Sequence, residues 1–176
     1  MTVPSGLFGR SIYLQDDTGG IRVYLRRGDW PTLAAGDRVQ ATGWTENYHG
    51  ELELSVTNAA GLTLLGPGAA PAPLRVTTGQ IDEAHEGQLV WLVGRVVKFE
   101  RSAITLDDGS GPARVYFTES LPWRRPYVQI GAVWLATGVV SQYVAAQPYV
   151  GGYDLLPRFA SDFSRPPALL PVTGGE

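Results

Sequence analysis

Residues Ser11–Leu25 read SIYLQDDTGGIRVYL, and residues Ala103–Phe117, 92 positions further along, read AITLDDGSGPARVYF. The two stretches agree at seven of fifteen positions, including an Arg-Val-Tyr in each. A second pair also repeats, because Gly36–Tyr48 and Gly131–Tyr143 share a first Gly, an Ala-Thr-Gly and a final Tyr. The repeat unit of roughly ninety residues is too long for a solenoid repeat, so we interpret the chain as two tandem copies of one small module.

The composition favours a globular protein of short strands and turns. The 176 residues include 22 Gly and 13 Pro but no Cys, which excludes disulfides, thiolate zinc sites and cysteine nucleophiles. No run approaches the roughly 20 apolar residues of a membrane-spanning helix, so we expect no membrane insertion by this segment. The start, MTVPSGLFGR, lacks the apolar region of a signal peptide. Because the net charge is -3, nucleic-acid binding would require a local basic patch.

Apolar and polar residues alternate on both sides of each Gly-rich turn in the repeated stretches. This pattern predicts two β-hairpins, in which Asp and Gly supply the tight turn. In the second copy the same reasoning predicts five strands, at Gln88–Phe99, Ile104–Leu106, Ala113–Phe117, Val133–Tyr143 and Tyr153–Phe159. Closing them into a barrel would leave no exposed sheet edge.

The segments GRVVKF, ITLDDGSGPARVYF and GAVWLATGVV, with SIYLQDDTGGIRVYL and GDRVQATGW in the first copy, resemble bacterial OB-fold domains of the nucleic-acid-binding, tRNA-anticodon and helicase type. The resemblance implies an all-β fold of two tandem five-stranded Greek-key barrels. The first barrel would lack most of its first strand, since only the stub TVPSG remains. We expect a first module at 1–65, a Pro/Gly-rich linker at 66–78, a second module at 79–163 and a Pro-rich tail at 164–176.

The tail contains Leu170, Pro171, Val172, Thr173 and Gly174, which resemble the LPxTG sorting signal of proteins that sortases attach to the cell envelope. The resemblance implies a sortase as a partner and an extracellular or cell-surface location, as the exported part of a longer protein. If the match is a coincidence in a tail rich in Leu, Pro and Gly, the location is cytoplasmic.

Catalytic candidates are few. His49 and His85 are far apart in sequence, and no HExxH, GxSxG or P-loop pattern is present. Glu51 and Glu53 share one strand face, which we interpret as solvated. The aspartates at the hairpin turns suit backbone capping better than cation binding. We therefore expect no enzyme activity, no cofactor and no metal.

Binding is the favoured function. OB barrels bind oligonucleotides or oligosaccharides across strands two and three, and each copy places an Arg-x-Tyr on the outer face of strand three. Aromatic rings stack bases, at about 1 to 3 kcal/mol per base, while arginines meet phosphates. We predict binding of single-stranded DNA or RNA with little sequence preference, through Tyr13, Arg22, Tyr24, Arg26, Arg27, Lys98, Arg114, Tyr116, Trp123, Arg124 and Arg125.

Two alternatives remain. The chain could be a surface module that binds oligosaccharide or protein, or a structural spacer. Tyr on an outer strand is also favoured by β-propensity alone, and Arg can stack on Tyr without any ligand.

Overall fold

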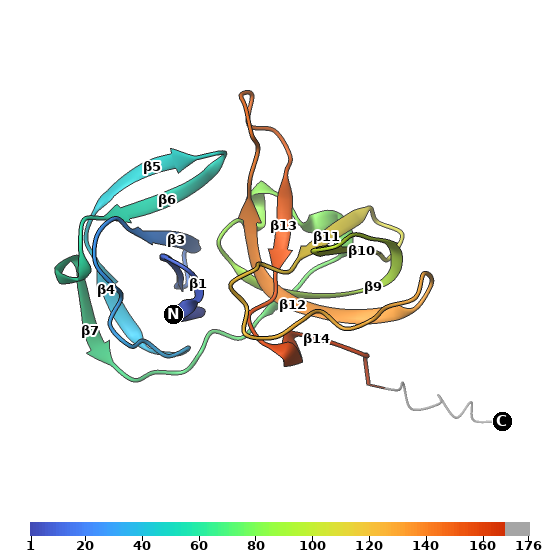
Figure 1. Ribbon diagram of the computed structural model, residues 1–176, viewed down its shortest axis with the longest axis horizontal. Helices are drawn as coiled ribbons and strands as arrows, with labels where there is room; N and C mark the ends of the chain where they lie inside the picture. The colour runs from blue at the N-terminus through green and yellow to red at the C-terminus, as the bar shows by residue number, and fades with distance from the viewer. Residues whose placement is uncertain (168–176) are drawn as a thin grey trace.

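A computed structural model describes residues 1–167 of the chain. All of its regular elements there are β-strands or single 3₁₀ turns, which confirms the all-β prediction. The strands gather in two halves joined by an extended segment (Figure 1). None of the helical segments in this part of the chain is long and apolar enough to cross a membrane. The predicted LPVTG motif lies outside the described residues.

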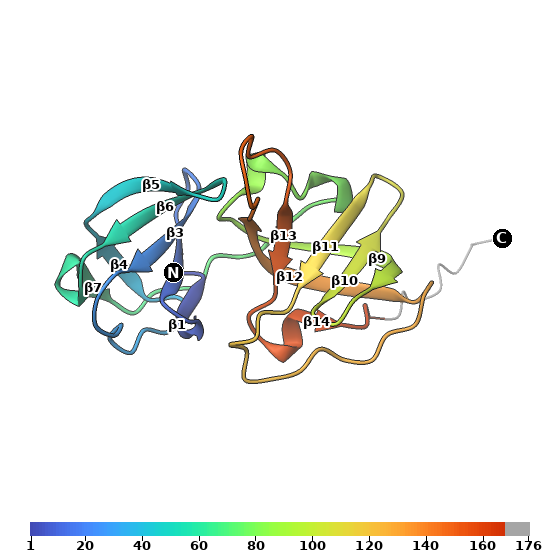
Figure 2. The same cartoon turned by 45° about the horizontal axis from the view of Figure 1, so that its top comes forward.

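The second half forms a closed five-stranded barrel, and Figure 2 shows its strands from a second angle. Antiparallel pairing joins β9 (Leu89–Phe99), β10 (Ala103–Asp107) and β11 (Pro112–Tyr116), and β11 runs parallel to β13 (Tyr153–Leu156). Strand β12 (Val133–Gln142) pairs with β13 and then with β9 from Val133 to Val139, which closes the ring. Two short strands pair beside the barrel strands: β8 (Leu74–Arg75) runs parallel to β9, and β14 (Phe163–Ser164) runs antiparallel to β12.

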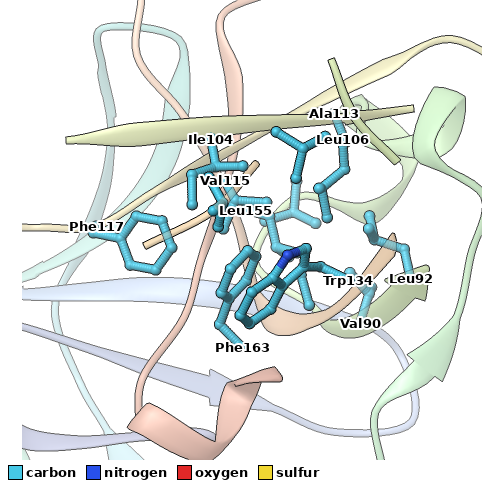
Figure 3. Packing of buried hydrophobic residues seen from close by; sticks show 14 of the residues in the cluster. Val90, Leu92, Ile104, Leu106, Ala113, Val115, Phe117, Trp134, Leu155 and Phe163 are labelled. Carbon is cyan, nitrogen blue, oxygen red and sulfur yellow. The ribbon is translucent and has the colours of Figure 1, made fainter. Parts of the chain in front are cut away.

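The barrel is filled by the inward residues of the alternating pattern. Ile104, Leu106, Val115 and Leu155 are fully buried, and Figure 3 shows them converging from different strands. Trp134 closes one end by stacking on Phe163, with ring centroids 4.7 Å apart and planes 10° from parallel. The side chains that alternate with these core residues therefore point outward, where they are available to a ligand or to the first half.

The first half repeats the strand order but does not close. Its main sheet runs β1 (Val3–Phe8), β2 (Ser11–Gln15), β3 (Gly20–Leu25), β6 (Glu51–Val56) and β5 (Trp44–Tyr48), with β3 parallel to β6. Strand β4 (Arg38–Ala41) pairs with β7 (Leu62–Gly66). Within residues 1–167 it does not pair with the first strand of its half, whereas β12 pairs with β9 and so closes the second barrel. A cavity of about 700 Å³ opens at this seam. Two complete barrels are therefore not confirmed.

Short turns complete the chain. The 3₁₀ turns are η1 (Ala59–Gly61), η2 (Thr78–Gln80), η3 (Glu83–His85) and η4 (Ala160–Asp162). Part of the expected linker belongs structurally to the second half, since β8 pairs with β9 and Val76 is buried in the barrel core. Strand β14 likewise extends one residue into the expected tail.

The repeated Ala-Thr-Gly has a structural explanation. A Cβ on Gly43 would lie 2.2 Å from the backbone oxygen of Ser55, and a Cβ on Gly138 would lie 2.6 Å from that of Leu156. Both glycines lie in or next to the fourth strand of their half, where it passes the backbone of the fifth. Only a residue without a side chain permits this approach.

The two halves are in contact. Val3 and Tyr13 of the first half form a buried cluster with Leu89 and Val139 of the second. A hydrogen bond also crosses the junction, because the Leu89 amide donates to Gln15 Oε1 at 2.8 Å. The outer sheet face of the first half is therefore partly covered.

Candidate nucleic-acid interface

The Arg-x-Tyr elements lie on outer strand faces, as predicted from the alternation. Val23 and Leu25 are buried in the core of the first half, so Arg22 and Tyr24 beside them point to the other face of β3. Val115 is buried in the second barrel in the same way, which turns Arg114 and Tyr116 outward.

Each arginine faces an acid across the parallel strand pair. In the first half Arg22 lies opposite Glu53, and in the second Arg114 lies opposite Asp154. Arg114 Nη1 donates to both carboxylate oxygens of Asp154, at 2.8 and 2.6 Å, and its guanidinium lies 5.0 Å from the centre of the Tyr116 ring. The repeat therefore includes an arginine-carboxylate pair. Alignment of the two copies missed it because Glu53 and Asp154 are different residue types in strands of little similarity.

Glu51 and Glu53 are buried, so the expectation that they form a solvated strand face is wrong. The side chain of Glu51 is only 1% exposed, and it accepts hydrogen bonds from Tyr13 Oη at 2.7 Å and Arg22 Nη1 at 3.1 Å. Burial raises the pKa of Glu51 to about 7, against the opposing effect of the Arg22 charge. Burial, followed by the Glu51 charge, also raises the pKa of Tyr13 well above its usual value.

Tyr13 consequently has no free ring face in this arrangement. It is 2% exposed, and its ring packs edge-on against Phe8 with centroids 6.2 Å apart. Tyr13 packs with Leu89 and Val139 of the second half, so it contributes to the junction. Arg22 is also less available to a ligand, because its Nε donates a hydrogen bond to Ser11 Oγ at 2.9 Å.

The remaining predicted residues are more accessible. Arg26 is held by Glu46 at 3.0 Å and lies 5.0 Å from the centre of the Trp44 ring, and Lys98 contacts Glu100 at 2.5 Å. Trp123 is half-buried and donates from its indole to the Arg158 carbonyl at 3.3 Å. Arg27 and Arg124 are exposed and could contact the phosphates of a nucleic acid. Arg125 donates a hydrogen bond to the Arg101 carbonyl.

The Arg-x-Tyr element of the first half borders the junction between the halves. A gap of about 190 Å³ is lined by Arg22 from the first half and by Thr118 and Ser141 from the second. Thr118 follows Tyr116 by two residues, and Ser141 lies opposite Asp154, the partner of Arg114. The junction therefore lies next to Arg22 and close in sequence to Tyr116, while Arg114 and Tyr116 do not line the gap.

The paired aspartates cap their turns. Asp16 Oδ1 accepts from the Thr18 amide at 2.8 Å, and Asp107 Oδ1 accepts from the Gly109 amide at 2.7 Å. Asp108 also joins the turn to η2, because Thr78 Oγ1 donates to it at 2.7 Å. Within residues 1–167, no three His, Asp or Glu side chains gather as metal ligands.

The histidines lie apart, as their spacing indicates. His85 contacts Asp82 at 3.0 Å. His49 is at the β5–β6 turn, where its ring centroid lies 4.5 Å from that of Tyr143 and 4.7 Å from that of Tyr48. Sequence reasoning missed this aromatic cluster, which joins loops of the two halves.

Among curated proteins, the chain is similar to the one named Endonuclease YhcR of Bacillus subtilis (strain 168). The two are 29% identical over 165 residues, which cover 86% of this chain and 13% of that protein. No family model matches the chain. Among solved structures, a chain in the structure titled OBody AM3L09 bound to hen egg-white lysozyme is similar over 54% of this chain and 95% of its own length, with 18% identity and a TM-score of 0.38. That score is too low to support an argument about fold.

The relative's name overturns one expectation. We predicted a chain without enzyme activity, from the absence of catalytic motifs. This chain is similar over 86% of its length to a protein named an endonuclease and is instead a candidate enzyme. The chain spans about an eighth of that protein's length, and the similarity extends over both halves of the chain.

Proposed function

We propose that this chain binds single-stranded nucleic acid and does so in the service of a nuclease. The observation that carries the proposal is the similarity to a protein named an endonuclease, which extends over 86% of the chain. Because the chain corresponds to only 13% of that protein, we propose a substrate-holding role for this segment, as one part of a larger assembly of domains.

We further propose that both halves are OB folds, with the first one open. Support comes from the shared strand order, in which the third strand runs parallel to the fifth and the fourth returns beside the fifth. In such barrels the outer face of strands two and three is the usual ligand surface. In this chain that face carries Arg22 and Tyr24 in the first half and Arg114 and Tyr116 in the second. Arg26 and Arg27 directly follow β3, and Lys98 is on the neighbouring strand β9.

The arrangement of the arginines suits modest affinity for the phosphate backbone of a nucleic acid. Arg22, Arg26 and Arg114 are held by carboxylates, so they offer planar guanidinium surfaces more readily than free charge. The exposed Arg27 and Arg124 are better placed to meet phosphates. Single-strand binding of this kind combines stacking with phosphate contacts and tolerates many sequences.

A fluorescence titration of labelled single-stranded DNA tests the proposal. We expect saturable binding at low salt, weakened several-fold by Tyr24→Ala or Tyr116→Ala, because each removes a stacking surface. The same mixtures, incubated with Mg²⁺ and run on a denaturing gel, test whether the chain also cleaves DNA. Absence of binding at low salt would contradict the proposal.

No observation in the described residues or in the comparisons favours an oligosaccharide-binding or protein-binding surface module, or a spacer. A cell-surface location and a sortase as partner remain proposals that rest on the LPVTG sequence alone.

A further inference from the structure

We propose that the outer face of β3, β6 and β5 contains a pocket for a single nucleobase carrying an exocyclic amino group, with Glu53 as the acceptor. This inference rests on the proposed function, because it names the base chemistry that the same face would recognise. The pocket is a cavity of about 250 Å³ lined by Arg22 and Tyr24 of β3, Arg26 just after β3, Glu53 of β6, and Glu46 and Tyr48 of β5. Sites that bury drug-sized ligands measure roughly 300 to 1,000 Å³, so this smaller cavity suits one flat ring system.

Strand register explains why these side chains meet. Arg22, Glu53 and Glu46 lie opposite one another on β3, β6 and β5 and form one row across the sheet. Tyr24 lies in the next row, opposite Ser55, and Tyr48 lies in the row on the other side, opposite Glu51. Glu53 is thus at the centre of the pocket floor, with a tyrosine in the row on each side.

Glu53 Oε2 forms an ion pair with Arg22 but has no hydrogen-bond donor among the described residues. Its side chain is 3% exposed, and Oε2 accepts no hydrogen bond from the described residues. Arg22 Nε lies 3.4 Å from Oε2, but it donates its proton to Ser11 Oγ instead. A buried acceptor without a donor costs free energy, which a bound N–H group would recover. Burial also raises the pKa of Glu53 above its usual value, as expected for a carboxylate that lacks donors.

The walls of the pocket suit a base. Tyr24 provides an aromatic ring, and the Arg22 guanidinium, 5.0 Å from the centre of the Tyr48 ring, provides a planar cation. Both kinds of surface stack unpaired bases in single strands. Cytosine, adenine and guanine carry an exocyclic amino group that can donate to Glu53, whereas the donor of thymine and uracil is the ring N3–H, which lies between two carbonyl oxygens that a carboxylate repels.

The test compares short labelled oligodeoxycytidine with oligothymidine on the full chain. We expect the wild-type protein to bind oligodeoxycytidine about fivefold or more tightly, since one good base contact gives discrimination of that order. Glu53→Gln should remove the preference, because the amide offers both a donor and an acceptor. Glu119→Gln is the matched control, as Glu119 is exposed and outside the pocket, and it should keep the preference.

The outcomes separate the two proposals. Equal binding of both oligonucleotides, or a preference that survives Glu53→Gln, would overturn the pocket and leave nucleic-acid binding intact. If Glu53→Gln does not fold, Tyr24→Leu replaces it, and an unchanged preference in that variant overturns the pocket. If neither oligonucleotide binds, the proposed function fails, and the pocket is tested alone by NMR titration with cytidine and thymidine. Cytidine should then shift the Tyr24 and Tyr48 ring resonances more than thymidine, and equal or absent shifts would refute the pocket.

Discussion

Ser141 of the second half donates a hydrogen bond from its hydroxyl to Glu51 Oε2 of the first half, at 3.1 Å. The same carboxylate also receives the Tyr13 hydroxyl and an Arg22 N–H. Three donors from two strands of one half and one strand of the other thus converge on one buried acid. Glu51 therefore contributes a polar contact to the junction, beside the buried cluster of Val3, Tyr13, Leu89 and Val139.

The stability of the protein should fall as the pH rises from weakly acidic values to neutrality. The pKa of Glu51 is raised to about 7 in the folded state from an ordinary value of 4.5, so the folded state binds its proton more tightly. The contribution is complete below pH 4.5 and is lost as the pH rises through about 7, by up to about 3 kcal/mol. Urea unfolding at a series of pH values measures it. Glu51→Gln should make the curve less steep in this range, while Glu119→Gln should not; an unaltered curve for Glu51→Gln would show that this carboxylate does not titrate as described.

Tyr13→Phe should destabilise the protein without abolishing ligand binding. The substitution keeps the buried ring but removes the donor to Glu51 Oε1, which costs about 1 to 3 kcal/mol for a buried acceptor. Thermal unfolding measures the loss, and Tyr116→Phe on the outer face of the second half is the matched control. A loss of DNA affinity at temperatures where Tyr13→Phe is fully folded would mean that this hydroxyl contacts the ligand.

Gly43→Ala and Gly138→Ala should each destabilise the fold, by roughly 1 to 3 kcal/mol as is usual for overpacking. The added methyl group would meet the fifth-strand backbone at 2.2 and 2.6 Å, respectively. Urea unfolding measures both losses. Gly131→Ala is the control, because its Cβ would meet no atom within 4 Å and the change therefore reports only the cost of a positive φ of 81°. Tolerance of alanine at both strand positions would refute the close approach that explains the repeat.

Much of the fold could be predicted from alternation and repetition. The strands predicted for the second barrel match β9 to β13 within three residues at each end, because buried alternating positions leave a clear pattern. The first half was predicted to be a barrel with only the stub TVPSG of its first strand, but β1 spans Val3–Phe8 and pairs with β2, and the failure of this half to close was not predicted. The missing strand pair at β4 could not be predicted, because which strands pair depends on the three-dimensional arrangement of distant segments and not on the local sequence.

The site was less predictable. Outward orientation of Arg22, Tyr24, Arg114 and Tyr116 follows from strand period, and the structure agrees. Burial of Tyr13, Glu51 and Glu53 does not follow, because it results from packing of one half on the other and from pairing between distant strands. A carboxylate in a strand therefore looks solvated until its neighbours are known.

The most direct test of nucleic-acid binding is the salt dependence of affinity for labelled single-stranded DNA. Each phosphate contact should contribute about 0.7 to the slope of log affinity against log salt concentration. We predict a negative slope for the wild-type chain that Arg27→Gln reduces by about that amount, whereas Arg38→Gln, which changes an exposed cation at the seam of β4, leaves it unchanged. An affinity that does not vary with salt, or one that both substitutions change equally, would contradict the account.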